Sequence, residues 1–311
     1  MSAARFRRIA RLTVLCSIAL AGAVGAQQTG ADLILLRSPA SVRLAGMNGV
    51  GAAMVGDAGA VFTNPAGIAT VSHVALEGSY RSTPFDGYIA LGAIAWRLRQ
   101  LDFGFGLQYF DRGVELARVL DSATTIPVGA APQSHELLAV GSLIYRYGII
   151  AFGGSVKLAR QQTLAVRRRG LGADAGLAIA IFDIMALGFS IQNIGGNLRD
   201  DSDLRLPRLS RFGFTLNYVD PQETLRLLST FEVQWPDGEA SRFVLGVEGG
   251  VVVSGVGIKG RFGYGTTTFA DRTDFTYGAS VDIADMNLDY SFESDNLLGE
   301  TAHRFGLRLR L

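Results

Sequence analysis

The sequence has little of what most enzymes and metalloproteins use for chemistry. Cysteine occurs once in 311 residues, at Cys16, and histidine occurs three times. One cysteine excludes an internal disulfide, and no cluster of histidine, cysteine and acidic residues has metal-ligand spacing. Only 18% of the residues are charged, and a net charge of +1 argues against a nucleic-acid surface. We therefore expect no cofactor, no metal and no nucleic-acid partner.

The first 26 residues have the pattern of a secretory signal peptide. Four arginines precede an apolar run over 12–24, and Val24-Gly25-Ala26 has small residues at positions −3 and −1 of a cleavage site. The apolar run has about 13 residues, fewer than the ~20 that a spanning helix needs. We therefore predict secretion and a mature chain that begins at Gln27, without Cys16.

No long unbroken apolar segment follows residue 26, although 48% of the residues are hydrophobic. Inside a lipid bilayer every backbone N–H and C=O group must be bonded within the protein, which leaves helices and closed barrels as spanning structures. Because no segment is suited to a spanning helix, this hydrophobic chain with 39 glycines is predicted to form a closed, all-β barrel.

From about residue 73 onward, large apolar residues alternate with small or polar residues. The segments 101–109 and 286–293 show the alternation most clearly. Segments of about ten residues with period two, separated by turn residues, are typical of membrane-spanning strands. We predict 14 strands, centred near residues 78, 92, 105, 140, 154, 176, 189, 213, 230, 245, 260, 278, 290 and 306. Two of them, Tyr88 to Trp96 and Leu137 to Tyr145, are apolar on both faces, which leaves their orientation open.

The lengths of the connections provide a second test of this count. Connections after odd-numbered strands include long ones, such as 112–134, 162–170 and 196–207, whereas those after even-numbered strands are tight, such as 146–149. Bacterial barrels have long external loops and short periplasmic turns. We therefore predict a protein of the outer membrane, surrounded by outer-membrane lipid, with both termini in the periplasm.

Charged residues on these strands are expected to face the lumen. An arginine on the lipid face costs roughly 2–4 kcal/mol near the bilayer midplane. The predicted lumen charges are Glu77, Asp102, Lys157, Glu232, Glu248, Lys259, Arg261, Asp289, Glu293, Arg304 and Arg308. They are interpreted either as internal ion pairs that hold the wall, since buried charges pair, or as a ring that selects a substrate by charge.

Two further features give weaker signals. An outer-membrane lipase would need serine and histidine oriented by a third group. Ser134-His135 and His303 have no supporting motif, so we predict no enzyme and no catalytic residue.

Arg167-Arg168-Arg169 falls in a predicted external loop. This run is interpreted as solvated charge or as a contact with lipopolysaccharide phosphates.

Residues 27–72 have no strand pattern. The stretch 41–51 is small and glycine-rich, and 57–60 is a candidate short helix that Asn64-Pro65 would end, because proline disfavours α conformation at the residue before it. Fourteen strands enclose a wider lumen than an eight-stranded barrel, which fills its interior with side chains. We predict that 27–72 is an N-terminal hatch that plugs a 14-stranded antiparallel transmembrane β-barrel formed by 73–311.

Two runs within this segment resemble a known family. Arg43-Leu44-Ala45-Gly46-Met47-Asn48-Gly49 and Gly56-Asp57-Ala58-Gly59-Ala60-Val61-Phe62-Thr63-Asn64-Pro65-Ala66-Gly67 are similar to the hatch of FadL/TodX-type outer-membrane transporters, and to the PorV/PorQ branch of that superfamily. Asn48 stands where glycine is usual, and Asp57 stands alone where two acids are common. The resemblance implies a hatch role for Asp57, Asn64, Pro65, Ala66 and Gly67. The alternative is an ordinary turn at a helix end.

The resemblance implies two alternative functions. FadL-type members pass fatty acids or aromatic hydrocarbons, which implies a passive channel or binder for hydrophobic small molecules. PorV-like members serve type IX secretion, which implies an accessory protein that docks secreted cargo or secretion-system proteins at the outer surface. A continuous apolar path past the hatch would favour the channel, and a blocked lumen with a large apolar external rim would favour docking.

Overall fold

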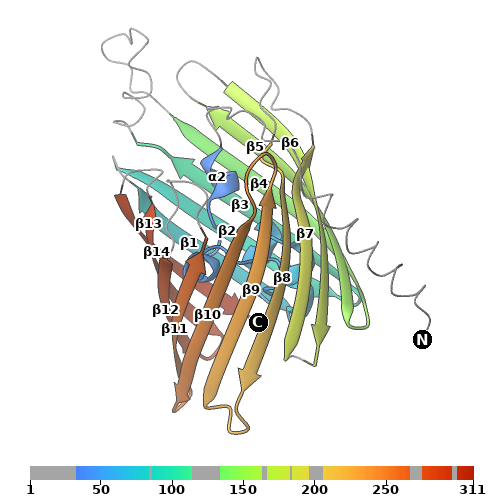
Figure 1. Ribbon diagram of the computed structural model, residues 1–311, viewed down its shortest axis with the longest axis vertical. Coiled ribbons are helices and arrows are strands. Elements are labelled where there is room, and N and C mark those ends of the chain that lie inside the picture. The colour runs from blue at the N-terminus through green and yellow to red at the C-terminus, as the bar shows by residue number, and fades with distance from the viewer. Residues whose placement is uncertain are drawn as a thin grey trace, which may run out of the picture. The chain divides into compact units, whose positions relative to one another are not determined.

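The computed structural model describes residues 33–83, 86–113, 134–162, 167–182, 184–195, 206–266, 275–295 and 300–311. The predicted signal peptide lies outside these residues. The described chain forms one closed antiparallel barrel, in which each strand pairs with its neighbours in sequence and β1 pairs with β14 (Figure 1). The strands are β1 (Val74–Thr83), β2 (Gly87–Leu98), β3 (Leu101–Asp111), β4 (His135–Tyr147), β5 (Ile150–Gln162), β6 (Arg167–Ile181), β7 (Met185–Gly195), β8 (Leu209–Val219), β9 (Leu225–Pro236), β10 (Arg242–Val253), β11 (Val256–Gly265), β12 (Phe275–Ile283), β13 (Met286–Asp295) and β14 (Glu300–Arg310). The predicted fold class, with all 14 strands, is confirmed.

The two faces of the wall follow the alternation of the sequence. Successive side chains of a strand point to opposite faces. On β14, Phe305 and Leu307 are 58% and 38% exposed on the outside, whereas Arg304 and Arg308 are buried on the inside. The outer face therefore carries the apolar band that lipid requires, and the charges lie within the barrel.

The orientation of β2 and β4, which the sequence leaves open, is set by what lies inside the barrel. Ile89 and Leu91 of β2 and Val140 of β4 are buried and belong to one hydrophobic cluster with Val61 and Phe62 of the N-terminal segment. These strands are apolar on both faces because one face meets lipid and the other packs on this segment.

Tight turns join the strands at one end of the barrel, which we call the short-turn end. Four of these connections have two residues, at 99–100, 148–149, 254–255 and 284–285. The loop predicted over 162–170 is wrong in extent, because β6 begins at Arg167 and this residue pairs with Gln162. The three consecutive arginines therefore belong to a strand, where the ladder to β5 extends further than the apolar pattern indicates.

The N-terminal segment, described from Leu33 to Ser72, contains only short helical turns. They are α2 (Ile34–Arg37), α3 (Val42–Ala45), η1 (Ala58–Phe62) and η2 (Pro65–Thr70), the last two being 3₁₀ helices. The helix predicted from Asp57 onward is η1. Proline has a fixed φ that suits the first position of a helix, and Pro65 begins η2 after the turn formed by Thr63 and Asn64. Among the described residues, no helix is long and apolar enough to cross a membrane.

Replacing Leu307 on the outer face with arginine tests the assignment of the faces. Leu307→Arg places a charge in the lipid-facing band, so the free energy of unfolding should fall by roughly 2–4 kcal/mol. Leu307→Ala serves as the control, because it shortens the side chain without adding charge. Urea unfolding in lipid vesicles, followed by tryptophan fluorescence, measures both. An arginine variant as stable as the alanine variant would contradict the assignment.

Candidate functional site

The N-terminal segment is fastened to the wall by a buried network of ion pairs around Asp57. Its Oδ2 accepts a hydrogen bond from Arg43 Nη1 at 2.6 Å. Its Oδ1 accepts bonds from Arg308 Nη1 at 2.8 Å and from Arg310 Nη2 at 2.7 Å. Burial alone would raise the pKa of Asp57, but the guanidinium groups of Arg308, Arg43 and Arg310 hold it well below its ordinary value. Asp57 is therefore a carboxylate that joins the segment to β14.

Arg43 extends the same network to other strands of the wall. It donates to both oxygens of Glu248 on β10, from Nη2 at 2.8 Å and from Nε at 3.0 Å. Glu248 also accepts from Arg261 Nε at 2.5 Å, and Arg261 Nη1 reaches Asp289 at 2.7 Å. Asp289 in turn accepts two bonds from Arg308. The charges thus close a circuit that includes both Arg43 and Asp57.

Other charged side chains of the wall form hydrogen bonds with the backbone N–H and C=O groups of the irregular segment. A buried backbone N–H without a partner is costly. Glu232 accepts from the N–H groups of Gly51 and Ala52, both at 2.7 Å, and Glu77 accepts from Gly59 N at 2.9 Å. Arg304 of β14 donates to the carbonyl oxygens of residues 39 and 40, at 2.5 and 2.7 Å. These lumen charges therefore replace the strand partners that the segment lacks.

Asn64 fixes the turn between η1 and η2. Its Oδ1 accepts from Ala66 N at 3.1 Å, and its Nδ2 donates to the carbonyls of Ala52 at 2.6 Å and of Leu177 on β6 at 3.1 Å. Pro65, Ala66 and Gly67 are buried beside it. A Cβ on Gly67 would lie 2.7 Å from the carbonyl oxygen of Met54, so the segment folds back on itself only with glycine at this position.

Inward-facing glycines of the wall allow the segment to approach the strands. A Cβ on Gly188 would lie 1.8 Å from the carbonyl oxygen of Ala52, and a Cβ on Gly176 would lie 2.1 Å from Asn64 Oδ1. Because these glycines lack a side chain, the backbone of the segment lies directly against the strands at these positions.

The remaining predicted lumen charges lie in separate groups. Lys157 pairs with Asp174 at 2.8 Å, Asp102 with Arg146 at 2.7 Å, and Glu293 with Arg304 at 3.4 Å. Lys259 pairs with Asp282. The eleven predicted positions therefore do not form a single ring in the described structure, and most of them contact a residue of opposite charge or the N-terminal segment.

Four residues that contribute to these contacts were not among the predicted site residues. Arg43 and Arg310 complete the Asp57 network, Arg211 donates to the carbonyl of Gly49, and Glu136 accepts from Leu35 N. Arg43 carried a signal in the sequence, since it belongs to the run that resembles a hatch. Arg310 and Arg211 alternate with outward apolar residues of their strands, which predicts that they face inward. Neither signal identifies the partner of the charge.

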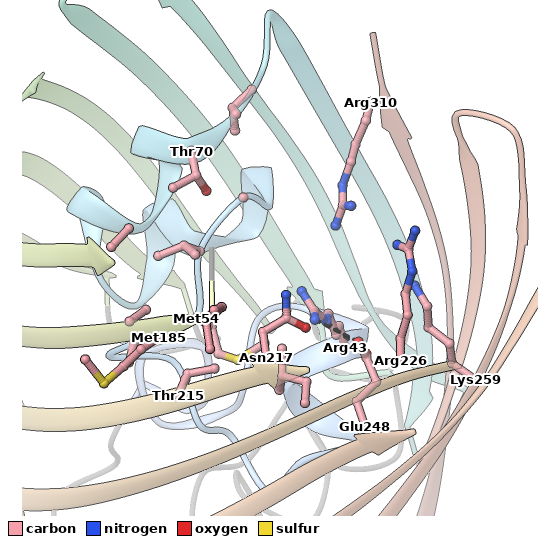
Figure 2. A pocket seen from close by; sticks show the side chains of 18 of the residues that line it. Arg43, Met54, Thr70, Met185, Thr215, Asn217, Arg226, Glu248, Lys259 and Arg310 are labelled. Carbon is pink, nitrogen blue, oxygen red and sulfur yellow. Dashed lines mark hydrogen bonds and ion pairs between the residues drawn. The ribbon is translucent and has the colours of Figure 1, made fainter. Parts of the chain in front are cut away.

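A cavity of about 430 Å³ lies at the short-turn end, between the N-terminal segment and the wall. Its lining includes Met54 and Met185 on one side and the cationic side chains of Arg226, Lys259 and Arg310 on the other (Figure 2). Apolar residues extend the methionine side, namely Val55, Val71, Ala180, Ile184, Ala186 and Leu228. Lys259 and Arg310 already pair with Asp282 and Asp57. The cavity therefore suits a small molecule with an apolar body, and Arg226 offers a cation to an acidic group.

The described residues contain no group of three or more histidine, aspartate or glutamate side chains that could hold a metal ion. No protein family model matches the sequence, and a search of curated proteins gives no match.

Solved structures share the fold. The toluene transporter TbuX of Ralstonia pickettii is 14% identical, with 87% of this chain and 98% of that chain aligned and a TM-score of 0.57. The toluene transporter TodX of Pseudomonas putida is 13% identical over 89% and 97%, with a TM-score of 0.56. A FadL homologue of Pseudomonas aeruginosa is 13% identical over 86% and 97%, with a TM-score of 0.55. At these identities the likeness establishes the architecture of the barrel.

Neutralising Asp57 tests the network. Asp57→Asn leaves three guanidinium groups around a neutral amide, and breaking a buried ion pair in this way costs about 3–5 kcal/mol. Hydrogen exchange of residues 41–70 should therefore become faster in Asp57→Asn. Asp220→Asn is the control, because Asp220 is exposed in a turn and bonds only within it. Equal exchange in both variants would contradict the role of Asp57.

The same network predicts the effect of pH on this exchange. A carboxylate whose pKa is lowered by folding contributes stability that is fully present above the ordinary pKa of about 4 and is lost as pH falls through the lowered value. Protection that depends on Asp57 should therefore be constant from about pH 7 to about pH 5. A loss of protection at pH 5 that is abolished by Asp57→Asn would contradict this account.

Proposed function

We propose that the protein is an outer-membrane channel related to the FadL type, which passes hydrophobic small molecules, aromatic or fatty-acid-like, passively toward the periplasm. The observation that carries the proposal is the cavity between the N-terminal segment and the short-turn end. The fold supports it, because barrels of this architecture include toluene transporters. In this proposal the short turns and both termini are periplasmic.

The cavity has the size and lining of a site for a small ligand. Its volume of about 430 Å³ lies in the range of small-molecule sites, about 300–1,000 Å³. Met54, Met185 and Leu228 offer adaptable apolar contacts, and Arg226 offers a positive charge to a carboxylate. An aromatic hydrocarbon would use the apolar side alone, and a fatty acid would use both sides.

We further propose that residues 27–72 act as a hatch in the barrel formed by 73–311. Met47, Val50, Asn64 and Ala66 have no exposed surface, so a solute that crosses the lumen requires part of this segment to move. Asp57 then fastens the hatch to the wall, and the turn at 64–67 holds its fold. The many charge-assisted bonds make the fastened state the resting state.

The alternative function in type IX secretion depends on an apolar rim at the external end. The predicted external loop 112–134 includes residues 114–133, which lie outside the described residues. No observation favours this role over the channel, and membership of the PorV/PorQ branch stays a prediction. We propose no catalytic role, in line with the transport functions named for the barrels of similar fold.

Filling the cavity tests the proposed function. Ala186 lines it and is 6% exposed, so Ala186→Phe should weaken the binding of toluene and of a fluorescent fatty acid by about 10-fold, because a ring then occupies the site. The matched control is Ala279→Phe, on the outer face of β12. Fluorescence titration and uptake into vesicles measure both variants. Unchanged binding and uptake in Ala186→Phe would exclude the cavity as the ligand site.

A further inference from the structure

Three arginines gather on the outer face of β5 and β6, at the end of the barrel away from the short turns. The two strands lie side by side (Figure 1), with Arg160 directly opposite Arg169 and Gln162 opposite Arg167. Side chains at alternate positions share a face, so Arg160 follows Leu158 outward, and Arg167 and Arg169 lie beyond Leu171. We call Arg160, Arg167 and Arg169 the arginine trio.

The arginine trio is unusual for its charge. Like charges directly opposite each other on a sheet are destabilising, yet no carboxylate of the described residues forms an ion pair with any of the three. The Nε of Arg160 is buried and has no hydrogen-bond partner there. Other cations of the wall have partners, such as Lys157 with Asp174. The trio therefore has donors that suit an anion from outside the chain.

The position of the trio along the wall indicates where that anion lies. Leu158 and Leu171, the outward residues next to the trio, are 49% and 62% exposed and belong to the lipid-facing band. On the neighbouring strand β4, His135 is opposite Gln162 and stacks on Tyr109 of β3 with ring centroids 5.8 Å apart. Outward aromatic rings at the end of an apolar band mark the interface with lipid headgroups. The trio thus lies at headgroup level.

We propose that the arginine trio binds the phosphates of a phosphorylated glycolipid of the outer leaflet, of the lipid A type. This inference rests on the outer-membrane location and on the orientation with periplasmic short turns given under the proposed function, but not on the cavity or the hatch. A guanidinium pairs with phosphate through two parallel charge-assisted bonds. Three guanidinium groups on two paired strands offer more donors than the single phosphate of a phospholipid can accept, which favours a headgroup with two phosphates.

Binding of defined lipids to the purified full chain in detergent tests the proposal. Native mass spectrometry would compare bisphosphorylated lipid A, the same lipid after enzymatic dephosphorylation, and phosphatidylglycerol. The wild-type protein should prefer bisphosphorylated lipid A over both other lipids by at least about 10-fold, and this preference should shrink as salt screens the charges. Equal binding of the three lipids would overturn the proposal.

The variant Arg160→Gln/Arg167→Gln/Arg169→Gln should lose this preference. The matched control is Arg208→Gln, since Arg208 is an exposed arginine before β8 that already pairs with Asp237 at 3.3 Å. A triple variant that keeps the full preference, or a control that loses it equally, would overturn the proposal. If the triple variant fails to fold, the comparison of lipids and the salt dependence on the wild-type protein decide.

A further variant distinguishes two possible partners of the trio, a lipid phosphate and a carboxylate of the chain itself. The sequence of the β7–β8 connection contains Asp200, Asp201 and Asp203. If these acids neutralise the trio, the wild-type protein should bind all three lipids equally, and Asp200→Asn/Asp201→Asn/Asp203→Asn should gain the preference for phosphate. That result would overturn the proposal. A preference that is the same in this variant and in the wild-type protein would support it.

Discussion

The N-terminal segment carries a buried carboxylate, Asp57, and the ion pairs of this carboxylate connect the segment to the wall of the barrel. Asp57 contacts Arg43 within its own segment and Arg308 and Arg310 on β14. Arg43 in turn reaches Glu248 on β10. Removing either residue would break the buried circuit of ion pairs between them and the wall, so the N-terminal segment and the wall depend on each other.

This dependence explains why so much of the wall is shaped for the segment. Glu77 and Glu232 accept from backbone N–H groups that no strand reaches, and Gly176 and Gly188 leave the space in which that backbone lies. A barrel with an open aqueous lumen would have no use for either feature. The structure is therefore that of a barrel whose interior the N-terminal segment occupies, with a cavity between this segment and the short-turn end of the wall.

The strands could be predicted from the sequence because lipid imposes a strict alternation on the outer face. The alternation failed to orient β2 and β4, since Leu91 and Val140 pack on an apolar surface inside the barrel that no local pattern reveals. It also began β6 too late, because the ladder between β5 and β6 already includes Arg167, which lies beyond the lipid-facing band.

The candidate site was less predictable than the strands, for a physical reason. An inward charge can be inferred from its cost in lipid, but its partner lies on a distant part of the chain. Arg43 and Glu248 are 205 positions apart, and Asp57 and Arg308 are 251 apart. Such pairs follow from the closure of the barrel and from the path of the segment within it, and neither has a local signature.

A reversible cross-link between the segment and the wall tests the central claim, that transport requires the hatch to move. A Cβ built on Gly306 lies 3.4 Å from Val42 Cβ, close to the spacing that a disulfide needs. Only Cys16, in the predicted signal peptide, could interfere. The variant Val42→Cys/Gly306→Cys should lose uptake of toluene into vesicles when oxidised and regain it with reductant, while Val42→Cys alone, treated with the same oxidant, keeps its uptake. Full uptake by the oxidised, cross-linked protein would contradict the claim.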